Sequence, residues 1–578
     1  VDGNHRLPSG LFGEFRERLY QHYGGPGQVA TGWVSNTLFE PHVGNRILHE
    51  MVAEEPGITV LKGHTLDSVH LDGGRIEWIS ARDSAGVERR IEGRVFIEAT
   101  EYGDLLAAAG AAYSHYMETF EQTGEPGAPA EPRPYLQDLT YVAILKDYGP
   151  GQDRTIPRPE QYDISDFTCM CRQVCPSQPE EVIDCQQMLN YGKLPNGKYM
   201  INWPNQGNDT YVDLLELSPA ERDTALVAAK QMTLSWIHFL QTEGGFTNLG
   251  LADDEFPTDD RLALIPYIRE SRRVVGADRL FLTDILDPYA DSSRPIYKTG
   301  IAVGDYPVDH HRKKNPVPDQ IEFPPIPSYN VPYGALVPES VNGLLVAEKS
   351  ISVSNVANGT SRLQPVVLQI GQSAGAAAAL AVQLGVEPRD VPVRALQARL
   401  LEADMFLMPF LDVQPENVYF EAVQRVGLTG VMRGTGIPFQ WANQTWFYPD
   451  SVVSRAQFAD IAARAAALVG TQDSAGSAGS PGSASSAGSP VQAGAADSAS
   501  LGDAPLTSGM LREWFGGLES VGSALAEAEA ALSALDPAFS KNEDSPVTRA
   551  QLAYLLDAVL DPFERDAVGI GFPREIPQ

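Results

Sequence analysis

A short polar segment, Tyr306 to Arg312 with the sequence YPVDHHR, contains the residue types best suited to proton transfer. Histidine titrates near neutral pH, so His311 suits a general base that takes an O–H or N–H proton. Asp309 stands two residues earlier, where its carboxylate could orient the imidazole on a loop or along one face of a strand. The structural alternative is that Asp309 caps a turn and His311 packs against its neighbours. We interpret both as candidate catalytic residues.

A second charged run, Ile268 to Arg273 with the sequence IRESRR, suits an anion. If the run is helical, Arg269 shares a face with Arg272 and Arg273 at spacings of three and four residues. A partly buried arginine pair holds phosphate or carboxylate oxygens through paired hydrogen bonds. The alternative is ordinary surface pairing with Glu270. We count Arg269 among the candidate catalytic residues and Arg272 among those that bind a cofactor.

The hydrophobic pattern predicts elements that would position these residues. Leu344 to Ala347, LLVA, is short enough for a buried strand, and a polar loop follows from Ser350 to Ser361. Leu363 to Leu384 is long, apolar and rich in small residues, which predicts a helix, and Pro365 suits its first turn. The helix N-terminus offers free N–H groups to an anion or an electron-rich ring. A buried strand and helix of any α/β protein would show the same pattern.

This order of residues resembles the C-terminal flavin-contacting segment of the glutathione-reductase-like FAD-dependent oxidoreductases. Six segments between residues 10 and 400 resemble, in the expected order, the branch of that family often mislabelled as xanthan lyase. They are Leu38–Ala81, Arg94–Tyr113, Leu194–Asp209, Tyr267–Gly276, Gly304–His311 and Val331–Lys349. The resemblance implies an α/β, glutathione-reductase-like FAD-binding fold, bound FAD, and hydride transfer from a substrate C–H bond to flavin N5.

The resemblance also implies which residues contact FAD. One group matches the family's Asp-Ala-Thr-x-x-Gly-Asp segment near the adenosine and pyrophosphate, with Glu98 at its first position. The other expected contacts are small or polar residues of the helix predicted from Leu363 to Leu384, and two arginines. The expected contacts are Glu98, Thr100, Gly103, Asp104, Arg272, Arg362, Gly371, Gln372, Ala374 and Gly375. The resemblance implies no metal.

The chain departs from the family at the FAD pyrophosphate. The family begins with a strand, a Gly-x-Gly-x-x-Gly turn and a helix, and this sequence has no such motif. The GGPGQ run from Gly24 to Gln28 follows a helix-like stretch, so it predicts a helix stop. An N-terminal piece is missing from the sequence, or it is a separate chain, or FAD has been lost. We favour the first two explanations because the other flavin-facing segments are intact.

The composition limits the partners. The 578 residues suffice for about three domains, and the net charge of −32 argues against nucleic acid and anionic membrane surfaces. No apolar run approaches the roughly 20 residues of a membrane span, and no signal peptide is visible. The cysteines, Cys169, Cys171, Cys175 and Cys185, fit disulfides of an exported protein or free thiols, while their spacing is unusual for a metal site.

The end of the chain contains an internal repeat, in which Val453 to Phe458 matches Val547 to Leu552. Ser454 and Thr548 are expected helix N-caps. These segments resemble S-layer homology repeats, which hold bacterial proteins at the cell envelope. The resemblance implies an exported, periplasmic or envelope-associated protein and a cell-wall polymer as partner. A plain helical domain and a cytoplasmic location stay compatible with the sequence.

We therefore expect six segments. They are the first part of the FAD-binding fold (1–115), an α+β substrate region (116–335), the returning part of the FAD-binding fold (336–400), an S-layer-homology-like repeat (405–470), an Ala/Gly/Ser/Pro-rich linker (471–504) and a helical, degenerate repeat (505–578). Within the substrate region, Ser218 to Gly244 predicts a long helix with Ser218 as N-cap, Pro219 at its first position and Glu221 completing a capping box.

The sequence thus predicts an FAD-dependent oxidoreductase with a small-molecule or carbohydrate-type substrate. One alternative is a non-catalytic envelope protein on a decayed flavoprotein fold. Another is a subunit whose partner chain completes the FAD site. The Asp309/His311 motif and the Gly371–Gly375 helix segment favour the enzyme, because a decayed site has no reason to keep them.

Overall fold

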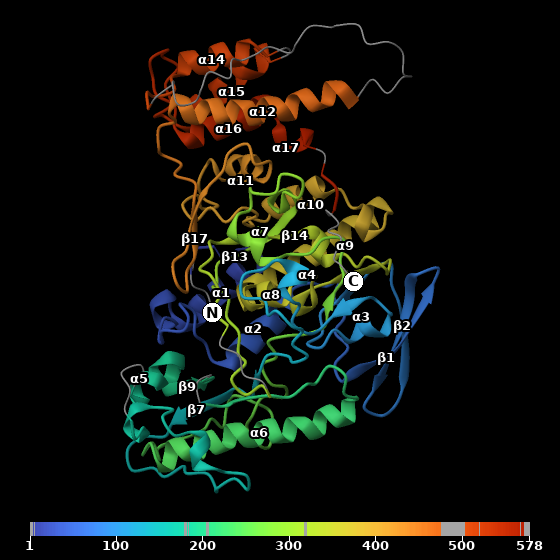
Figure 1. Ribbon diagram of the computed structural model, residues 1–578, viewed down its shortest axis with the longest axis vertical. Coiled ribbons are helices and arrows are strands. Elements are labelled where there is room, and N and C mark those ends of the chain that lie inside the picture. Colours follow the sequence, from blue (N-terminus) through green and yellow to red (C-terminus); the bar gives the residue numbers. More distant parts are fainter. Residues whose placement is uncertain are drawn as a thin grey trace.

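The computed structural model describes residues 4, 6–7, 9–177, 182, 184–203, 207–316, 321–475, 503–518, 521–566 and 568–570. It is a mixed α/β structure, elongated in one direction (Figure 1). The α-helices are α1 Gly10–Tyr23, α2 Pro41–Ala53, α3 Asp104–Ala108, α4 Phe120–Thr123, α5 Cys185–Leu189, α6 Pro219–Thr242, α7 Leu282–Leu286, α8 Asn355–Ser361, α9 Gln364–Leu384, α10 Val393–Leu401, α11 Phe420–Leu428, α12 Arg455–Ala475, α14 Ser508–Gly516, α15 Gly522–Leu535, α16 Arg549–Leu560 and α17 Pro562–Arg565.

The strands are short and form several small sheets. They are β1 His64–Asp72, β2 Arg75–Asp83, β3 Glu88–Glu92, β4 Phe96–Glu98, β5 Tyr113–Ser114, β6 Leu139–Thr140, β7 Ala143–Asp147, β8 Lys193–Leu194, β9 Lys198–Ile201, β10 Asp209–Thr210, β11 Leu249–Leu251, β12 Arg273–Val274, β13 Gly300–Gly304, β14 Tyr329–Pro332, β15 Leu344–Val346, β16 Thr435–Ile437 and β17 Gln444–Trp446. In Figure 1 the C-terminal helices lie at one end of the long axis and α6 lies at the other.

The middle of the molecule contains the predicted strand and helix. β15 pairs in parallel with β4, with Leu344 opposite Phe96, and all three residues of β15 are buried. α9 follows and buries one face, including Ile370 and Ala374, against the core. The expected helix from Leu363 is confirmed to within one residue. Pro365 lies in its first turn, where a missing N–H costs nothing.

The segment before α9 differs from its prediction as a loop. Residues Asn355–Ser361 form α8, and every one of them is buried. Ser354 is the N-cap, and its hydroxyl accepts a hydrogen bond from the N–H of Ala357 at 3.1 Å. Polar composition suggested a solvated loop, but here the polar side chains bond to buried partners from distant parts of the chain.

α9 also corrects the expectation that no apolar run reaches membrane length. With 21 residues it is the one described helix long and apolar enough to cross a bilayer. Half of its most apolar window is buried inside the fold, as in the core helix of a globular domain. Length and composition alone are therefore weak grounds for a membrane span.

The region at the other end of the long axis is built on a four-stranded antiparallel sheet of order β11-β7-β9-β8, with α6 close by (Figure 1). α6 begins as predicted: Ser218 is its N-cap, Pro219 its first residue, and Glu221 completes the capping box. Two disulfides, Cys169–Cys175 and Cys171–Cys185, close the loop before α5. The cysteines therefore pair with one another, and none is left free.

The C-terminal helices are organised by three similar segments, of which the sequence revealed only two. The N–H of Val453 donates to the carbonyl of Val547, that of Val547 to Leu506, and that of Leu506 to Val453, at 2.7–3.0 Å. Each segment enters a helix, α12, α14 or α16. Ser454 and Thr548 are N-caps as predicted, and Thr507 is the third. This cyclic arrangement has threefold pseudosymmetry. Most of the predicted linker, 471–504, lies outside the described residues.

Candidate active site

His311 lies between two carboxylates. Its Nδ1 is 2.6 Å from Oδ2 of Asp209, and its Nε2 is 3.2 Å from Oδ2 of Asp309. Asp209 comes from β10 and is buried, whereas 29% of the Asp309 side chain is exposed. The predicted pairing of Asp309 with His311 is thus present in the structure. Both ring nitrogens of His311 therefore have a carboxylate oxygen within hydrogen-bond distance.

Arg362 holds Asp309 from the other side. One guanidinium nitrogen donates to Oδ2 of Asp309 at 2.9 Å, and the other donates to the hydroxyl of Tyr267 at 2.6 Å. Burial alone would raise the pKa of Asp309, but its contacts with His311 and Arg362 bring that pKa well below its usual range. Asp309 is therefore a carboxylate at neutral pH.

Arg269 is fully buried on the Asp209 side of the site. It donates to the carbonyl of Asp138 at 2.7 Å, to the hydroxyl of Thr140 at 2.8 Å and to Oδ1 of Asp209 at 3.3 Å. Burial acts to raise the pKa of Asp209, and Arg269 together with His311 lowers it overall. Two buried guanidinium groups, from Arg269 and Arg362, thus hold the two carboxylates that contact His311.

The run Ile268 to Arg273 is extended, which corrects the helical prediction. Tyr267 exchanges both backbone hydrogen bonds with Thr140, and Arg273 begins β12. Adjacent side chains of an extended chain point in opposite directions. The side chain of Arg272 consequently points away from that of Arg269. It donates to the carbonyl of Tyr102 at 2.8 Å and to Asp104 at 3.2 Å. The predicted arginine face does not form.

The residues expected near the FAD adenosine surround the start of α3. Glu98 is buried, and its carboxylate accepts hydrogen bonds from the backbone N–H groups of Thr100, Leu105 and Leu106. Gly103 has a left-handed conformation (φ 66°) that turns the chain into α3. Asp104, partly exposed, forms ion pairs with Arg222 and Arg272. Glu98 therefore stabilises the N-terminus of α3 through Oε2 and holds the preceding Thr100 through Oε1.

The four expected residues of α9 point in different directions. Gly371 and Gly375 lie on the exposed face, where an added Cβ would meet nothing within 4 Å. Ala374 is buried in the core. The side-chain oxygen of Gln372 accepts a hydrogen bond from the N–H of Leu11 at 2.7 Å, so this residue attaches α1 to α9. The open part of this helix is a face of small residues.

The site has unmet polar groups that suit a polar ring system. Nε of Arg269, Nε of Arg362, Nε2 of Gln137 and Oδ1 of Asn358 are buried and have no hydrogen-bond partner in the described part of the chain. Each such group costs about 1–3 kcal/mol. They include three donors and one acceptor. The chemistry of this set fits a flavin, whose ring offers carbonyl acceptors and an N–H donor.

Several of these neighbours were missed in the sequence. Asp209 is 102 residues from His311, and Gln137, whose Oε1 accepts from the backbone N–H of His311 at 3.2 Å, is 174 residues away. Asp209 lies at the end of the segment Leu194–Asp209, and that position was the only available signal. The adjacent, half-buried His310 lies beside Arg312, and loss of solvation together with the Arg312 charge lowers its pKa well below the usual value, so it is neutral.

Comparison with known proteins identifies a family for most of the chain. A family model described as FAD dependent oxidoreductase matches residues 1–400. No curated protein and no solved structure gives a significant match.

Proposed function

Since the chain belongs to the FAD-dependent oxidoreductase family, we propose that it oxidises a small-molecule or carbohydrate-type substrate and that Asp309 and His311 handle the substrate's proton. The family indicates an FAD cofactor. Bound FAD supplies the acceptor, at flavin N5, for hydride from a substrate C–H bond. The observation behind the proposal is the chain Arg362–Asp309–His311–Asp209, in which a partly exposed carboxylate and an imidazole are held by buried charges.

Asp209 has the orienting role in this proposal. Its contact with Nδ1 at 2.6 Å fixes the ring, so that Nε2 is the atom that exchanges a proton. Asp309, at 3.2 Å from Nε2, is the most exposed member of the chain and faces an entering substrate. In the state in which Nε2 is unprotonated, it takes the O–H or N–H proton as the C–H bond breaks.

The arginines would hold negative charge. Arg269 and Arg362 are buried and permanently charged, and in this proposal they would stabilise the negative charge that a flavin ring gains on reduction. The face of α9 at Gly371 and Gly375 offers an open, flat surface for the cofactor, and Arg272 lies beside Asp104 at the α3 turn. These residues are the ones we propose to hold FAD.

A further segment or partner chain completes the sheet in this proposal. β4 and β15 form a sheet of only two strands in the described part of the chain, so one edge of β4 has no strand partner. Ile97, at the centre of that edge strand, is 38% exposed. Open, apolar strand edges are normally covered. In this proposal, a strand added beside β4 places a pyrophosphate-binding turn close to α3.

The C-terminal helices support attachment to the cell envelope. The cyclic contact of Val453, Leu506 and Val547 gives three related segments, as a repeat-based binding module requires. The two disulfides favour an oxidising compartment. We propose an exported or envelope-associated protein that binds a cell-wall polymer through these repeats. The β16–β17 hairpin connects this region to the site, because the N–H of Asn443 donates to the carbonyl of Asp305 at 3.0 Å.

The test is flavin binding and reduction by the protein purified from its natural source, with the mass of every chain present. Visible flavin absorption that bleaches with substrate is expected. His311→Gln and Asp209→Asn should each slow bleaching about 10²–10⁴-fold while flavin stays bound. The control Asp291→Asn, at an exposed turn, should leave the rate unchanged. A colourless protein that FAD cannot reconstitute would refute the enzyme and leave the non-catalytic envelope protein.

A further inference from the structure

A cleft of about 710 Å³ lies between the start of α2 and two loops of the substrate region, away from the contacts of His311. Its volume is within the range of about 300–1,000 Å³ typical of small-molecule sites. Much of its wall is apolar, including Phe256, Leu264 and Ile265. Leu264 is 72% exposed and the adjacent Ile265 is 45% exposed, so this part of the apolar wall is open to a ligand.

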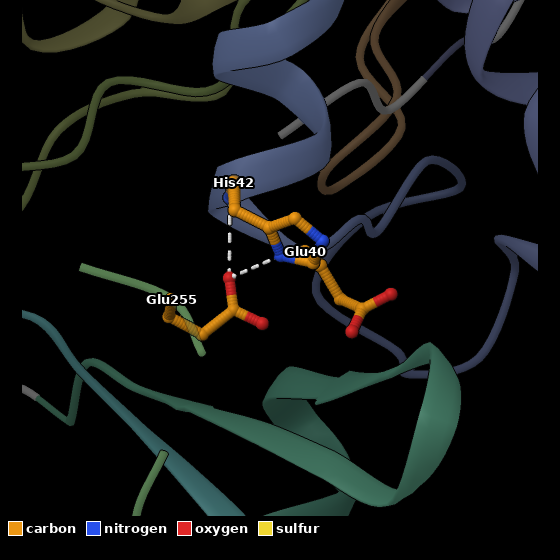
Figure 2. Close-up of side chains that lie close together, drawn as sticks. All are labelled: Glu40, His42 and Glu255. Atoms are coloured by element: carbon orange, nitrogen blue, oxygen red, sulfur yellow. Dashed lines mark hydrogen bonds and ion pairs between the residues drawn. The ribbon is translucent and has the colours of Figure 1, made fainter. Parts of the chain in front are cut away.

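The polar part of the cleft is a histidine held by a buried carboxylate. Nδ1 of His42 is 3.0 Å from Oε2 of Glu255, and the backbone N–H of His42 donates to the same oxygen at 3.1 Å (Figure 2). Glu255 is fully buried, whereas 43% of the His42 side chain is exposed. In the neutral ring, Nδ1 has the proton and Nε2 presents a lone pair. Nε2 has no hydrogen-bond partner within the described ranges.

The position of Lys198 argues against a metal ion at the cluster formed by Glu40, His42 and Glu255. Glu40, His42 and Glu255 have ligand atoms within 4.8 Å of one another, as a metal site would. The buried ammonium of Lys198, however, already contacts Glu255 and lies 2.6 Å from Glu40. This internal cation occupies the space that a metal ion would take. The cluster therefore favours a ligand that approaches from the open side, at His42.

The open side offers mainly hydrogen-bond acceptors. Asp253 and Asp254 line the cleft beside His42, and Lys146 pairs with both at 3.0 and 3.3 Å. Four carboxylates, those of Glu40, Asp253, Asp254 and Glu255, stand against the two ammonium groups of Lys146 and Lys198. The net charge of these six groups is therefore −2. A headgroup that only donates hydrogen bonds and is positively charged matches this arrangement.

We propose that this cleft binds a primary organic ammonium ion with an apolar body. The ammonium donates to Nε2 of His42 and to a carboxylate of Asp253 or Asp254 in the cleft wall, while the apolar body packs against Phe256 and Leu264. Glu255 and Lys198 position His42 and fix its tautomer. This site is distinct from the one at His311, and it does not depend on the proposed oxidation.

Three probes of similar shape, benzylammonium, benzyl alcohol and benzoate, distinguish the contribution of the headgroup to binding from that of the aromatic ring. Their binding to the full chain is measured by calorimetry at neutral pH and low salt. Benzylammonium should bind at least tenfold more tightly than benzyl alcohol, and benzoate should be weakest. Equal binding of benzoate and benzylammonium, or no binding of any probe at millimolar concentration, would overturn the proposal.

Two variants locate the binding. His42→Phe keeps the ring's bulk but removes the acceptor, and it should weaken benzylammonium about tenfold. Leu264→Ser removes an apolar wall at an exposed position, so it should weaken benzylammonium and benzyl alcohol alike. The matched control is His49→Phe on the same helix, whose ring does not line the cleft. Benzylammonium affinity that His42→Phe leaves unchanged would place the ligand elsewhere and refute the site.

Discussion

Glu125 makes the stability of the fold depend on pH in a calculable way. Its side chain is fully buried, and Oε1 accepts from the N–H of Leu282 at 2.6 Å and from the hydroxyl of Ser354 at 2.5 Å. Oε2 has no partner in the described structure. Burial raises the pKa of Glu125 to about 7, more than the two hydrogen bonds lower it.

The direction and size of the pH effect of Glu125 on the unfolding free energy follow from proton linkage. Between pH 4.5 and 7 the folded state holds a proton on Glu125 that the unfolded state has released, so the group's contribution falls as pH rises. A pKa raised from 4.5 to about 7 corresponds to about 3 kcal/mol of unfolding free energy, fully lost above pH 7. Glu125→Gln is neutral at every pH and keeps the accepting oxygen. Its stability relative to the native protein should therefore rise by about 3 kcal/mol from pH 4.5 to pH 8.

The assay is urea denaturation of both proteins at four pH values across this range, with the difference between them as the readout. The difference cancels other buried acids whose pKa is raised, such as Asp138 and Asp278. Glu121→Gln, at an exposed position of α4, is the control and should give a flat difference. A flat or falling difference for Glu125→Gln would refute the assignment of a buried, protonated carboxyl to this position.

Three further predictions concern stability. Lys198→Met leaves the buried carboxylates of Glu40 and Glu255 without their cation, so it should lower the free energy of unfolding by about 3–5 kcal/mol. The control Lys230→Met breaks a more exposed pair with Asp260 and should lower it by at most about 1 kcal/mol. Equal losses in the two variants would contradict this prediction. Removing the Cys171–Cys185 disulfide, which spans 14 residues, by the double substitution Cys171→Ser and Cys185→Ser should lower the unfolding free energy by about 3 kcal/mol. An unchanged denaturation midpoint in this variant would show that the bridge adds no stability. Thr507→Ala removes the N-cap of α14 and should cost about 1 kcal/mol, measured as a lower thermal midpoint; no loss would mean that the third segment is not ordered by its cap.

Local chemistry determined which elements could be predicted. The start of α6 depends on Ser218, Pro219 and Glu221, which lie within four residues and satisfy one another's backbone groups. The same holds for Ser454 and Thr548. The spacing of the run Ile268 to Arg273 fits a helix, but the preceding Tyr267 bonds to Thr140 and Arg273 pairs with Ser114, both distant in the chain. A pattern over six residues does not contain those partners.

The sequence by itself determined the chemical groups, the capped helices and the resemblance that led to FAD, because each depends on residues close together along the chain. Only the tertiary structure decided which groups meet. Asp209 approaches His311 across 102 residues, Glu255 approaches His42 across 213, and Leu506 joins Val453 and Val547 without sharing their Arg-Ala-Gln sequence. Burial and charge pairing depend on three-dimensional neighbours, so the lowered pKa of Asp309 and the open face at Gly371 follow from the fold and not from the order of residues.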